Sequence, residues 1–241
     1  MNTKVDEYSK NNENEVRKSA LITGANKGIG FETARQLLQK GFYVYMGTRD
    51  LKNGIEAVEK LRSEGLDNAE AIQLDVTDDD SVKTAREEIG RKTQVLDVLI
   101  NNAGINGGAP YTALEAATDQ FMTTFNTNVF GVARVTRAFI DLMHRDPNWP
   151  AYDYAKYAVY GSSKAAMNMY TVHLAYELRD TAFKINAVCP GYTKTDFTHH
   201  NGGEVEEAGK RIIKYALIDQ NGPTGKFFSE ESNPETGEIS W

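Results

Sequence analysis

The sequence predicts an α/β fold in which a doubly wound, Rossmann-like parallel sheet is flanked by helices in a single domain. Two observations carry this prediction. Short apolar runs alternate with helical patterns through the first hundred residues, and the glycine-rich octapeptide 23–30 lies between the first run and the first helical pattern. Regular strand–helix alternation is typical of parallel sheets built from right-handed βαβ units.

The predicted elements follow in order along the chain. Strands are expected at 19–23, 42–48, 69–74 and 95–100, and helices over 28–40, 53–64 and 79–91. The fourth strand is almost wholly apolar, which predicts burial on both faces of the sheet. The second half is less regular, with long helices expected over 121–143 and 157–178, strands at 184–189 and 225–228, and a polar, flexible stretch at 192–203.

Composition limits the kinds of protein this chain can be. Its 241 residues are enough for one sizeable domain, and the polar residues 1–18 predict a disordered tail before a domain over 19–241. The net charge of −7 argues against a nucleic-acid surface. No apolar run is long enough to span a membrane, and the polar start does not resemble a secretory signal, so a cytoplasmic protein is expected. The single cysteine, Cys189, excludes an internal disulfide, and no metal site is expected.

The octapeptide Thr-Gly-Ala-Asn-Lys-Gly-Ile-Gly predicts a dinucleotide site. Gly24 allows the tight turn, Gly28 lets a pyrophosphate approach the backbone, and Gly30 lets the helix pack closely on the strand. The free N–H groups and the positive end of the following helix then face the phosphates.

Polar residues also follow the fourth strand, where the chain reads Asn101-Asn102-Ala103-Gly104. Ligands of open α/β sheets bind outside the carboxyl ends of the strands. An asparagine there can bind a ligand or brace a loop, and both interpretations stay open.

Tyr160 and Lys164 are four residues apart and therefore share one face of a helix. An ammonium group close to a phenol favours its ionised form, which makes tyrosine a workable acid–base group. Tyr152 and Lys156 have the same spacing. We prefer the first pair because the residues inside it are small and would let a cofactor approach the helix.

These residues together resemble the classical short-chain dehydrogenase/reductase family over nearly the whole chain after the tail. The residues around the motifs are most similar to those of the carbonyl-reductase branch. The matching pieces are the octapeptide, Asp75-Val76, residues 101–104, Asn128 within Asn-Thr-Asn-Val-Phe-Gly, Tyr160-Gly-Ser-Ser-Lys164 and Pro190-Gly191.

The resemblance implies a role for each matching position. Tyr160 would donate a proton to the carbonyl oxygen of a small-molecule substrate, Lys164 would hold the nicotinamide ribose and assist Tyr160, and Asn128 would hold a water of a proton relay. Residues 192–203 would form a mobile substrate loop. The implied cofactor-binding residues are Gly24, Asn26, Lys27, Gly28, Ile29, Gly30, Arg49, Asp75, Val76, Asn102, Ala103, Gly104, Tyr160, Lys164, Pro190, Gly191 and Thr193.

Two cations favour NADP(H) over NAD as the cofactor. After the second strand the chain reads Gly47-Thr48-Arg49, with no acid placed to bind a ribose 2′-hydroxyl, and Lys27 lies inside the glycine turn. A 2′-phosphate suits such a pair.

The chain departs from the family between the two long helices. The family places a strand there, and a serine near its end helps the tyrosine polarise the carbonyl, whereas residues 144–156 contain two prolines and no strand pattern. Either the strand and its serine are truly lost near 144–145, or the sequence omits a segment there.

From the motifs together, the expected function is an NADPH-dependent oxidoreductase that reversibly reduces a ketone or aldehyde. The alternative is a catalytically impaired NADP-binding protein with a regulatory or structural role, and both a monomer and a homo-oligomer are compatible with the sequence.

Overall fold

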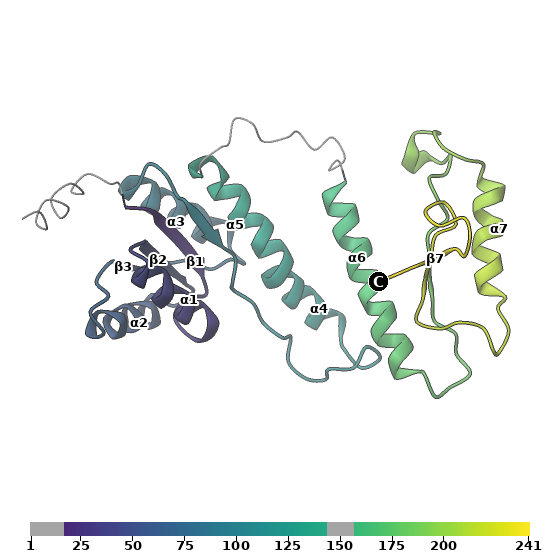
Figure 1. The fold of residues 1–241 in the computed structure, drawn as a ribbon, viewed down its shortest axis with the longest axis horizontal. Helices are drawn as coiled ribbons and strands as arrows, with labels where there is room; N and C mark the ends of the chain where they lie inside the picture. Colours follow the sequence, from purple (N-terminus) through teal and green to yellow (C-terminus); the bar gives the residue numbers. More distant parts are fainter. Residues whose placement is uncertain (1–16, 144–156) are drawn as a thin grey trace, which may run out of the picture. The chain divides into compact units, whose positions relative to one another are not determined.

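The computed structural model describes residues 17–143 and 157–241. The predicted Rossmann-like class is confirmed (Figure 1). Within the fold, the described residues form two compact units, one of 17–108 with 117–143 and the other of 109–116 with 157–241. Each unit is described by itself below. Most of the expected tail, the segment 144–156 and the Tyr152/Lys156 pair lie outside the described residues.

The first unit is built on a four-stranded sheet. Its strands are β1 (Ser19–Thr23), β2 (Tyr43–Thr48), β3 (Ala69–Gln73) and β4 (Val98–Ile100). They lie in the order β3-β2-β1-β4, and all three pairings are parallel. Parallel strands point their carboxyl ends to the same edge, so the polar segments that follow β1 to β4 meet there.

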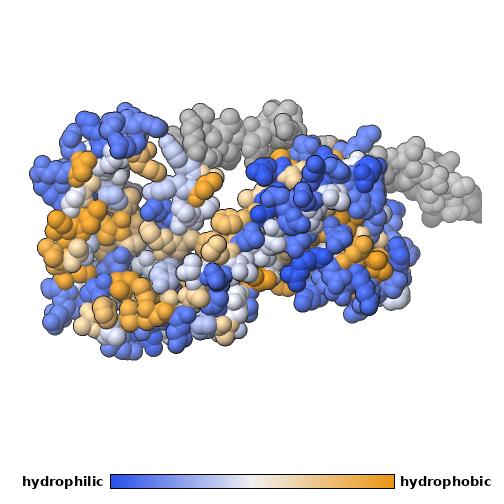
Figure 2. Space-filling view, turned by 180° about the vertical axis from the view of Figure 1, so that it is seen from behind, coloured by the Kyte–Doolittle hydropathy of each residue, from blue (hydrophilic) through white to orange (hydrophobic). Residues whose placement is uncertain are grey.

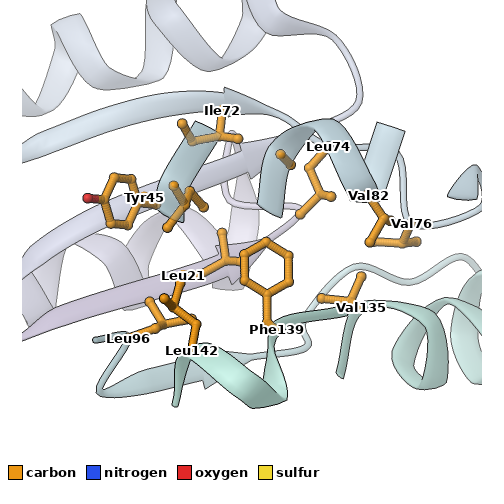
Figure 3. Packing of buried hydrophobic residues seen from close by; sticks show 12 residues of the cluster. Leu21, Tyr45, Ile72, Leu74, Val76, Val82, Leu96, Val135, Phe139 and Leu142 are labelled. Carbon is orange, nitrogen blue, oxygen red and sulfur yellow. The ribbon is translucent and has the colours of Figure 1, made fainter. Parts of the chain in front are cut away.

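Helices cover both faces of this sheet because neighbouring strand residues point to opposite sides. Ile22 packs with residues of α1 (Gly28–Gln39) and α2 (Leu51–Ser63), whereas Leu21 packs with residues of α3 (Asp79–Lys92) and α5 (Gly131–Phe139). Figure 3 shows the second cluster, in which the fully buried Phe139 of α5 lies beside Leu21 and Leu142. The doubly wound arrangement therefore follows from the apolar character of both faces of β1.

The single long helix predicted over 121–143 is wrong in its detail. The chain forms α4 (Thr118–Phe125), a π-helical turn η1 (Asn126–Phe130), α5, and a short 3₁₀ turn η2 (Ile140–Leu142). A π turn inserts one extra residue into a helix and is frequent at functional sites. Apolar periodicity does not reveal such a turn, because the helix continues on both sides of it.

The predicted burial of the fourth strand on both faces is also wrong. All three residues of β4 are only partly buried, whereas all five residues of β1 are buried. β1 has a partner strand on each side. Among the described residues, β4 has no second partner strand, and the isolated parallel bridge between Leu96 and Met143 lies just before it in the chain. Met143 is also the last described residue before 157.

The second unit consists of a long helix and a small sheet. The helix α6 (Ala158–Glu177) matches the predicted one within a residue at each end. The small sheet has the order β5-β6-β7, formed by β5 (Ala187–Val188), β6 (Phe227–Phe228) and β7 (Glu238–Ile239). The expected strand at 184–189 is shorter than predicted because Ile185 and Asn186 bind the turn at 223–226 instead of continuing the ladder.

Two elements of the second unit were not predicted. The helix α7 (Val205–Ala216) and the strand β7 lie in regions to which the sequence analysis assigned no structure. No helix in the part of the chain that the structure describes is long and apolar enough to cross a membrane. Figure 2 shows a largely polar surface on the face it presents, with apolar groups gathered in several patches.

Candidate active site

A cavity of about 1080 Å³ opens in the first unit beside the carboxyl ends of β1 to β4. The structure gathers around it every cofactor-binding residue that the sequence analysis placed in this unit. These residues are Gly24, Asn26, Lys27, Gly28, Ile29, Gly30, Arg49, Asp75, Val76, Asn102, Ala103 and Gly104. The segments that line the cavity are the glycine turn, the ends of β2 and β3 with the residues that follow them, the segment after β4, and parts of α4 and η1.

Each of the three glycines of the octapeptide is required for a different structural reason. Gly24 has φ +65°, and a Cβ there would lie 3.0 Å from the Cα of Ala103. A Cβ on Gly30 would lie 2.5 Å from Nδ2 of Asn102 and 2.6 Å from the carbonyl oxygen of Gly24. Gly28 has φ +58° and no atom within 4 Å of its Cβ position, so its outer side is open to a ligand. The tight turn, the close packing and the open approach expected at these positions are therefore all present.

The segment after β4 braces the glycine turn. Asn102 donates from Nδ2 to the carbonyl oxygens of Thr23 (2.8 Å) and Gly24 (3.1 Å). In return, the buried hydroxyl oxygen of Thr23 accepts the backbone N–H groups of Asn102 and Ala103, both at 3.0 Å. Of the two interpretations of this motif, the structure shows the loop brace for Asn102. The neighbouring Asn101 instead donates to the hydroxyl of Thr136.

The first turn of α1 is suited to an anion. Lys27 occupies the N-cap position without a side-chain capping hydrogen bond, and the first turn holds no acidic residue. Its backbone N–H groups and helix dipole therefore face the cavity without a carboxylate to occupy them. By contrast, the first turn of α3 carries Asp79 and Asp80.

Two cations line the same cavity and remain available to a ligand. Lys27 and Arg49 are exposed, and neither forms an ion pair with any residue of the described ranges 17–143 and 157–241. Asp50 also lines the cavity and was not predicted as a site residue. The Asp50 carboxylate caps α2 by accepting the N–H groups of Lys52 (2.9 Å) and Asn53 (3.4 Å). An aspartate directly before a helix is a strong capping signal, which the sequence analysis could have used.

Asp75 and Val76 form the wall after β3. The Asp75 carboxylate accepts the N–H (2.9 Å) and the hydroxyl (2.7 Å) of Thr77, which fixes the turn. Val76 packs against Gly131, where a Cβ would lie 2.8 Å from its side chain, and its carbonyl oxygen accepts a hydrogen bond from Arg134 at 2.6 Å. An apolar wall held in this way suits one face of a planar ring.

Asn128 lies in the π turn η1 and binds the segment after β4. Its side chain accepts the N–H of Ile105 and donates to the carbonyl oxygen of Ile105, both at 2.8 Å. Ile105 itself lines the cavity. Five lining residues from α4 and η1 were not predicted, because only the fold brings these elements to this edge; they are Met122, Thr123, Asn126, Thr127 and Phe130. The other unpredicted lining residues lie in or next to segments that follow the strands; apart from Asp50, they are Thr48, Asn53, Leu74, Thr77 and Ile105.

Tyr160 and Lys164 lie in the first turns of α6, in the second unit. Lys164 Nζ is 5.6 Å from the centre of the Tyr160 ring, and both side chains are exposed. Ser163 between them donates its hydroxyl back to the Tyr160 carbonyl oxygen, so it points along the helix. The phenol and the ammonium group are therefore neighbours on one helix face, as the spacing predicts.

Pro190 and Gly191 form a turn that two charged side chains hold in place. Arg211 of α7 donates to the Pro190 carbonyl oxygen at 2.7 Å, and Glu231 accepts the N–H of Tyr192 at 2.8 Å. Gly191 has φ +91°. Thr193 donates its hydroxyl to the Gly191 carbonyl oxygen at 3.0 Å, which tightens the turn. The described residues contain no group of three or more His, Cys, Asp or Glu side chains that could hold a metal ion.

Comparisons with known proteins show the family to which this chain belongs. Residues 24–226 match the family model described as enoyl-(acyl carrier protein) reductase. The chain belongs to the short-chain dehydrogenase/reductase family. It is 31% identical to (−)-isopiperitenone reductase of Mentha piperita, over 90% of this chain and 98% of that protein, and 30% identical to a (+)-neomenthol dehydrogenase of Capsicum annuum, over 87% and 94%.

A solved structure of the same fold, ElxO with NADP bound, superposes with a TM-score of 0.50 at 29% identity. It covers 88% of this chain and 96% of its own. Membership of the family makes this protein an oxidoreductase that acts on carbonyl or alcohol groups.

The alignment with the Mentha reductase is longer than the part of this chain that it includes. The alignment with the Mentha reductase runs over 312 positions but includes only 90% of the 241 residues, about 217. About 95 positions of that relative therefore have no counterpart in this chain.

Proposed function

We propose that this short-chain dehydrogenase/reductase uses NADPH to reduce a ketone or an aldehyde to an alcohol, and that it runs the reverse reaction as well. The observation that carries the proposal is the Tyr160–Lys164 pair, with the ammonium nitrogen 5.6 Å from the phenol ring on one helix face. The cavity and its glycine turn support the cofactor part of the proposal.

The residues of the first unit fit NADP(H). The open side of Gly28 and the uncapped first turn of α1 would hold the pyrophosphate, and Lys27 and Arg49 would bind the 2′-phosphate. Val76 would lie against the adenine, with Asp75 beside it. When bound, the cofactor supplies the hydride.

The residues of the second unit provide the proton chemistry. The Tyr160 hydroxyl would hydrogen-bond the substrate carbonyl oxygen and donate its proton to it as the alcohol forms. Lys164 would stabilise the phenolate that this transfer leaves behind, because a positive charge nearby favours the ionised phenol. We further propose that Asn128 holds a water through which the proton is restored, and that Pro190, Gly191 and Thr193 contact the nicotinamide end of the cofactor.

The direct test is NADPH oxidation by the full-length protein with a panel of ketones and aldehydes. Tyr160→Phe should lower kcat by about 100-fold or more, because it removes the only proton that the phenol can give. Tyr176→Phe, which alters another exposed tyrosine at the far end of α6, should leave kcat within twofold. No turnover of any carbonyl compound by the unaltered protein, or a fully active Tyr160→Phe variant, contradicts the proposal.

A second candidate is an NADP-binding protein that has lost catalysis. Among the described residues β4 is an edge strand, and residues 144–156 show no serine-bearing strand pattern; both observations favour this candidate. The alternative account of the same feature is a segment missing from the sequence near 144–145. Intact-mass measurement separates the two, since a mass of 26.8 kDa would show that no segment is missing. Tight NADPH binding without turnover by a protein of that mass would favour the non-catalytic candidate.

A further inference from the structure

The loop after the Pro190–Gly191 turn is an ordered, closed structure. Lys194 donates its N–H to the carbonyl oxygen of Gly203, and Gly203 donates its N–H to that of Tyr192, both at 2.9 Å. The two ends of residues 192–203 are therefore paired with each other. The sequence predicted only a polar, flexible stretch here, because this pairing joins residues nine or more positions apart.

The interior of the loop is held as tightly as its ends. The Thr198 hydroxyl donates to the Thr193 carbonyl oxygen at 2.6 Å and accepts the Thr195 N–H at 3.0 Å. His199 and His200 then adopt φ of 52° and 60°. Residues other than glycine keep this left-handed conformation only where their surroundings impose it.

This construction presents one aromatic side chain to Tyr160. Phe197 lies in the 3₁₀ turn η3 (Asp196–Thr198), and its ring centre is 5.1 Å from that of Tyr160 with a 46° angle between the planes. That distance is within the range of attractive aromatic pairs. Nevertheless, 67% of Phe197 and 45% of Tyr160 remain exposed, so both rings offer surface to a third group.

We propose that Phe197 is a specificity-determining residue, which selects carbonyl compounds that carry an aromatic or alicyclic group next to the carbonyl carbon. The inference rests on the proposed function of Tyr160. A carbonyl oxygen within hydrogen-bond reach of the Tyr160 hydroxyl places its substituents close to a ring 5.1 Å from the phenol. An apolar substituent gains contact with Phe197, whereas a methyl group is too small to cover it.

The charge next to Phe197 favours the same kind of substrate. Asp196 precedes Phe197 in η3, and its carboxylate oxygen lies 3.3 Å from Nε2 of His200, two residues beyond that turn. The fully exposed Asp196 side chain would disfavour an anionic substituent on the same side. Uncharged, bulky ketones therefore fit the loop best.

The test compares acetophenone with acetone as substrates of the full-length protein and of its Phe197→Leu and Phe197→Ser variants. Phe183→Leu is the matched control, because Phe183 is equally exposed in the same unit and lies outside the loop. We expect Phe197→Ser to lower kcat/KM for acetophenone by about 10–100-fold and that for acetone by less than twofold. Phe197→Leu should retain most of the preference, and Phe183→Leu all of it.

Two further outcomes separate failure of the inference from failure of the proposed function. An equal loss for both ketones means that Phe197 only supports the loop, and it overturns the inference while leaving the reductase intact. Failure of the unaltered protein to reduce these ketones and every other ketone or aldehyde of the panel rejects the proposed function. Acetophenone binding, measured by saturation-transfer NMR, then decides the role of Phe197: a weaker Kd in Phe197→Ser supports the apolar contact, and an unchanged Kd overturns it.

Discussion

Replacing Asn102 by alanine should weaken both the fold and cofactor binding, because this side chain joins the two loops that border the cavity. Its Nδ2 donates to the carbonyl oxygens of Thr23 and Gly24 at 2.8 and 3.1 Å. Alanine removes both donors and leaves the two acceptors without this partner in a partly buried place. The backbone N–H of residue 102 would still reach the Thr23 hydroxyl, so the loop loses part of its bracing and not all of it.

The expected loss follows from these two hydrogen bonds. Each neutral hydrogen bond contributes about 0.5–1.5 kcal/mol net, so the free energy of unfolding should fall by about 1–3 kcal/mol. For a chain of this size that corresponds to a fall in Tm of about 2–12 °C. If about 1.4 kcal/mol of the loss also affects the position of the glycine turn, NADPH would bind about tenfold more weakly.

The assay combines urea unfolding with a fluorescence titration of NADPH. Asn101→Ala is the control, since Asn101 is exposed and donates at 3.1 Å to the hydroxyl of Thr136, away from the glycine turn. Its effect should stay within about 0.5 kcal/mol, with an unchanged Kd. Equal effects of the two substitutions, or an unchanged Kd in Asn102→Ala, would refute the idea that this amide positions the binding loop.

Three further predictions concern pH, backbone strain and cofactor choice. Burial, followed by neighbouring charges, raises the pKa of Tyr45 from about 10 to about 12. The contribution of neutral Tyr45 to the free energy of unfolding should therefore be fully present below pH 10, and about 2–3 kcal/mol of it should be lost between pH 10 and 12. Tyr45→Phe should reduce this dependence of the unfolding free energy on pH, as measured by urea unfolding at alkaline pH. Gly191→Ala should lower the free energy of unfolding in urea by about 1–2 kcal/mol, because φ is +91° and Arg211 lies at the Cβ position. Gly209→Ala, in the interior of α7 where the Cβ position is open, should raise that free energy by about 0.5–1 kcal/mol. Arg49→Ala should raise the Kd of NADPH about 10–100-fold and leave that of NADH within twofold, and parallel losses for both cofactors would contradict the 2′-phosphate assignment.

The first half of the fold could be predicted from the sequence because local signals and tertiary structure agree there. The strands β1 and β2 are short and mostly apolar, and Gly41 and Gly65, which follow α1 and α2, adopt the positive φ that ends a helix. The predicted cofactor residues of the first unit line one cavity because they lie in the segments that follow the ends of its parallel strands. The start of α2 was misplaced by two residues because Asp50 was not read as its N-cap.

The second half was harder for two different reasons. The signal for α7 was present, with apolar residues at Val205, Ala208, Ile212 and Ile213 and acidic residues in the first turn, and it was overlooked. The contact between Phe197 and Tyr160 has no local signal at all, since it joins residues 37 positions apart. The π turn at Asn128 and the partly exposed β4 depend on packing around them, which periodicity cannot describe.

The hydroxyl of Thr23 has a consequence for how the nucleotide is recognised. Because this one buried oxygen accepts N–H groups from the segment after β4, and Asn102 returns two hydrogen bonds to the glycine turn, the two loops form a single rigid body. The conformational entropy of ordering them is lost when the chain folds and not when the ligand arrives. The site for the pyrophosphate end of the cofactor should therefore be preformed. Association at that end should proceed without a slow conformational step, even if the loop that carries Phe197 rearranges afterwards.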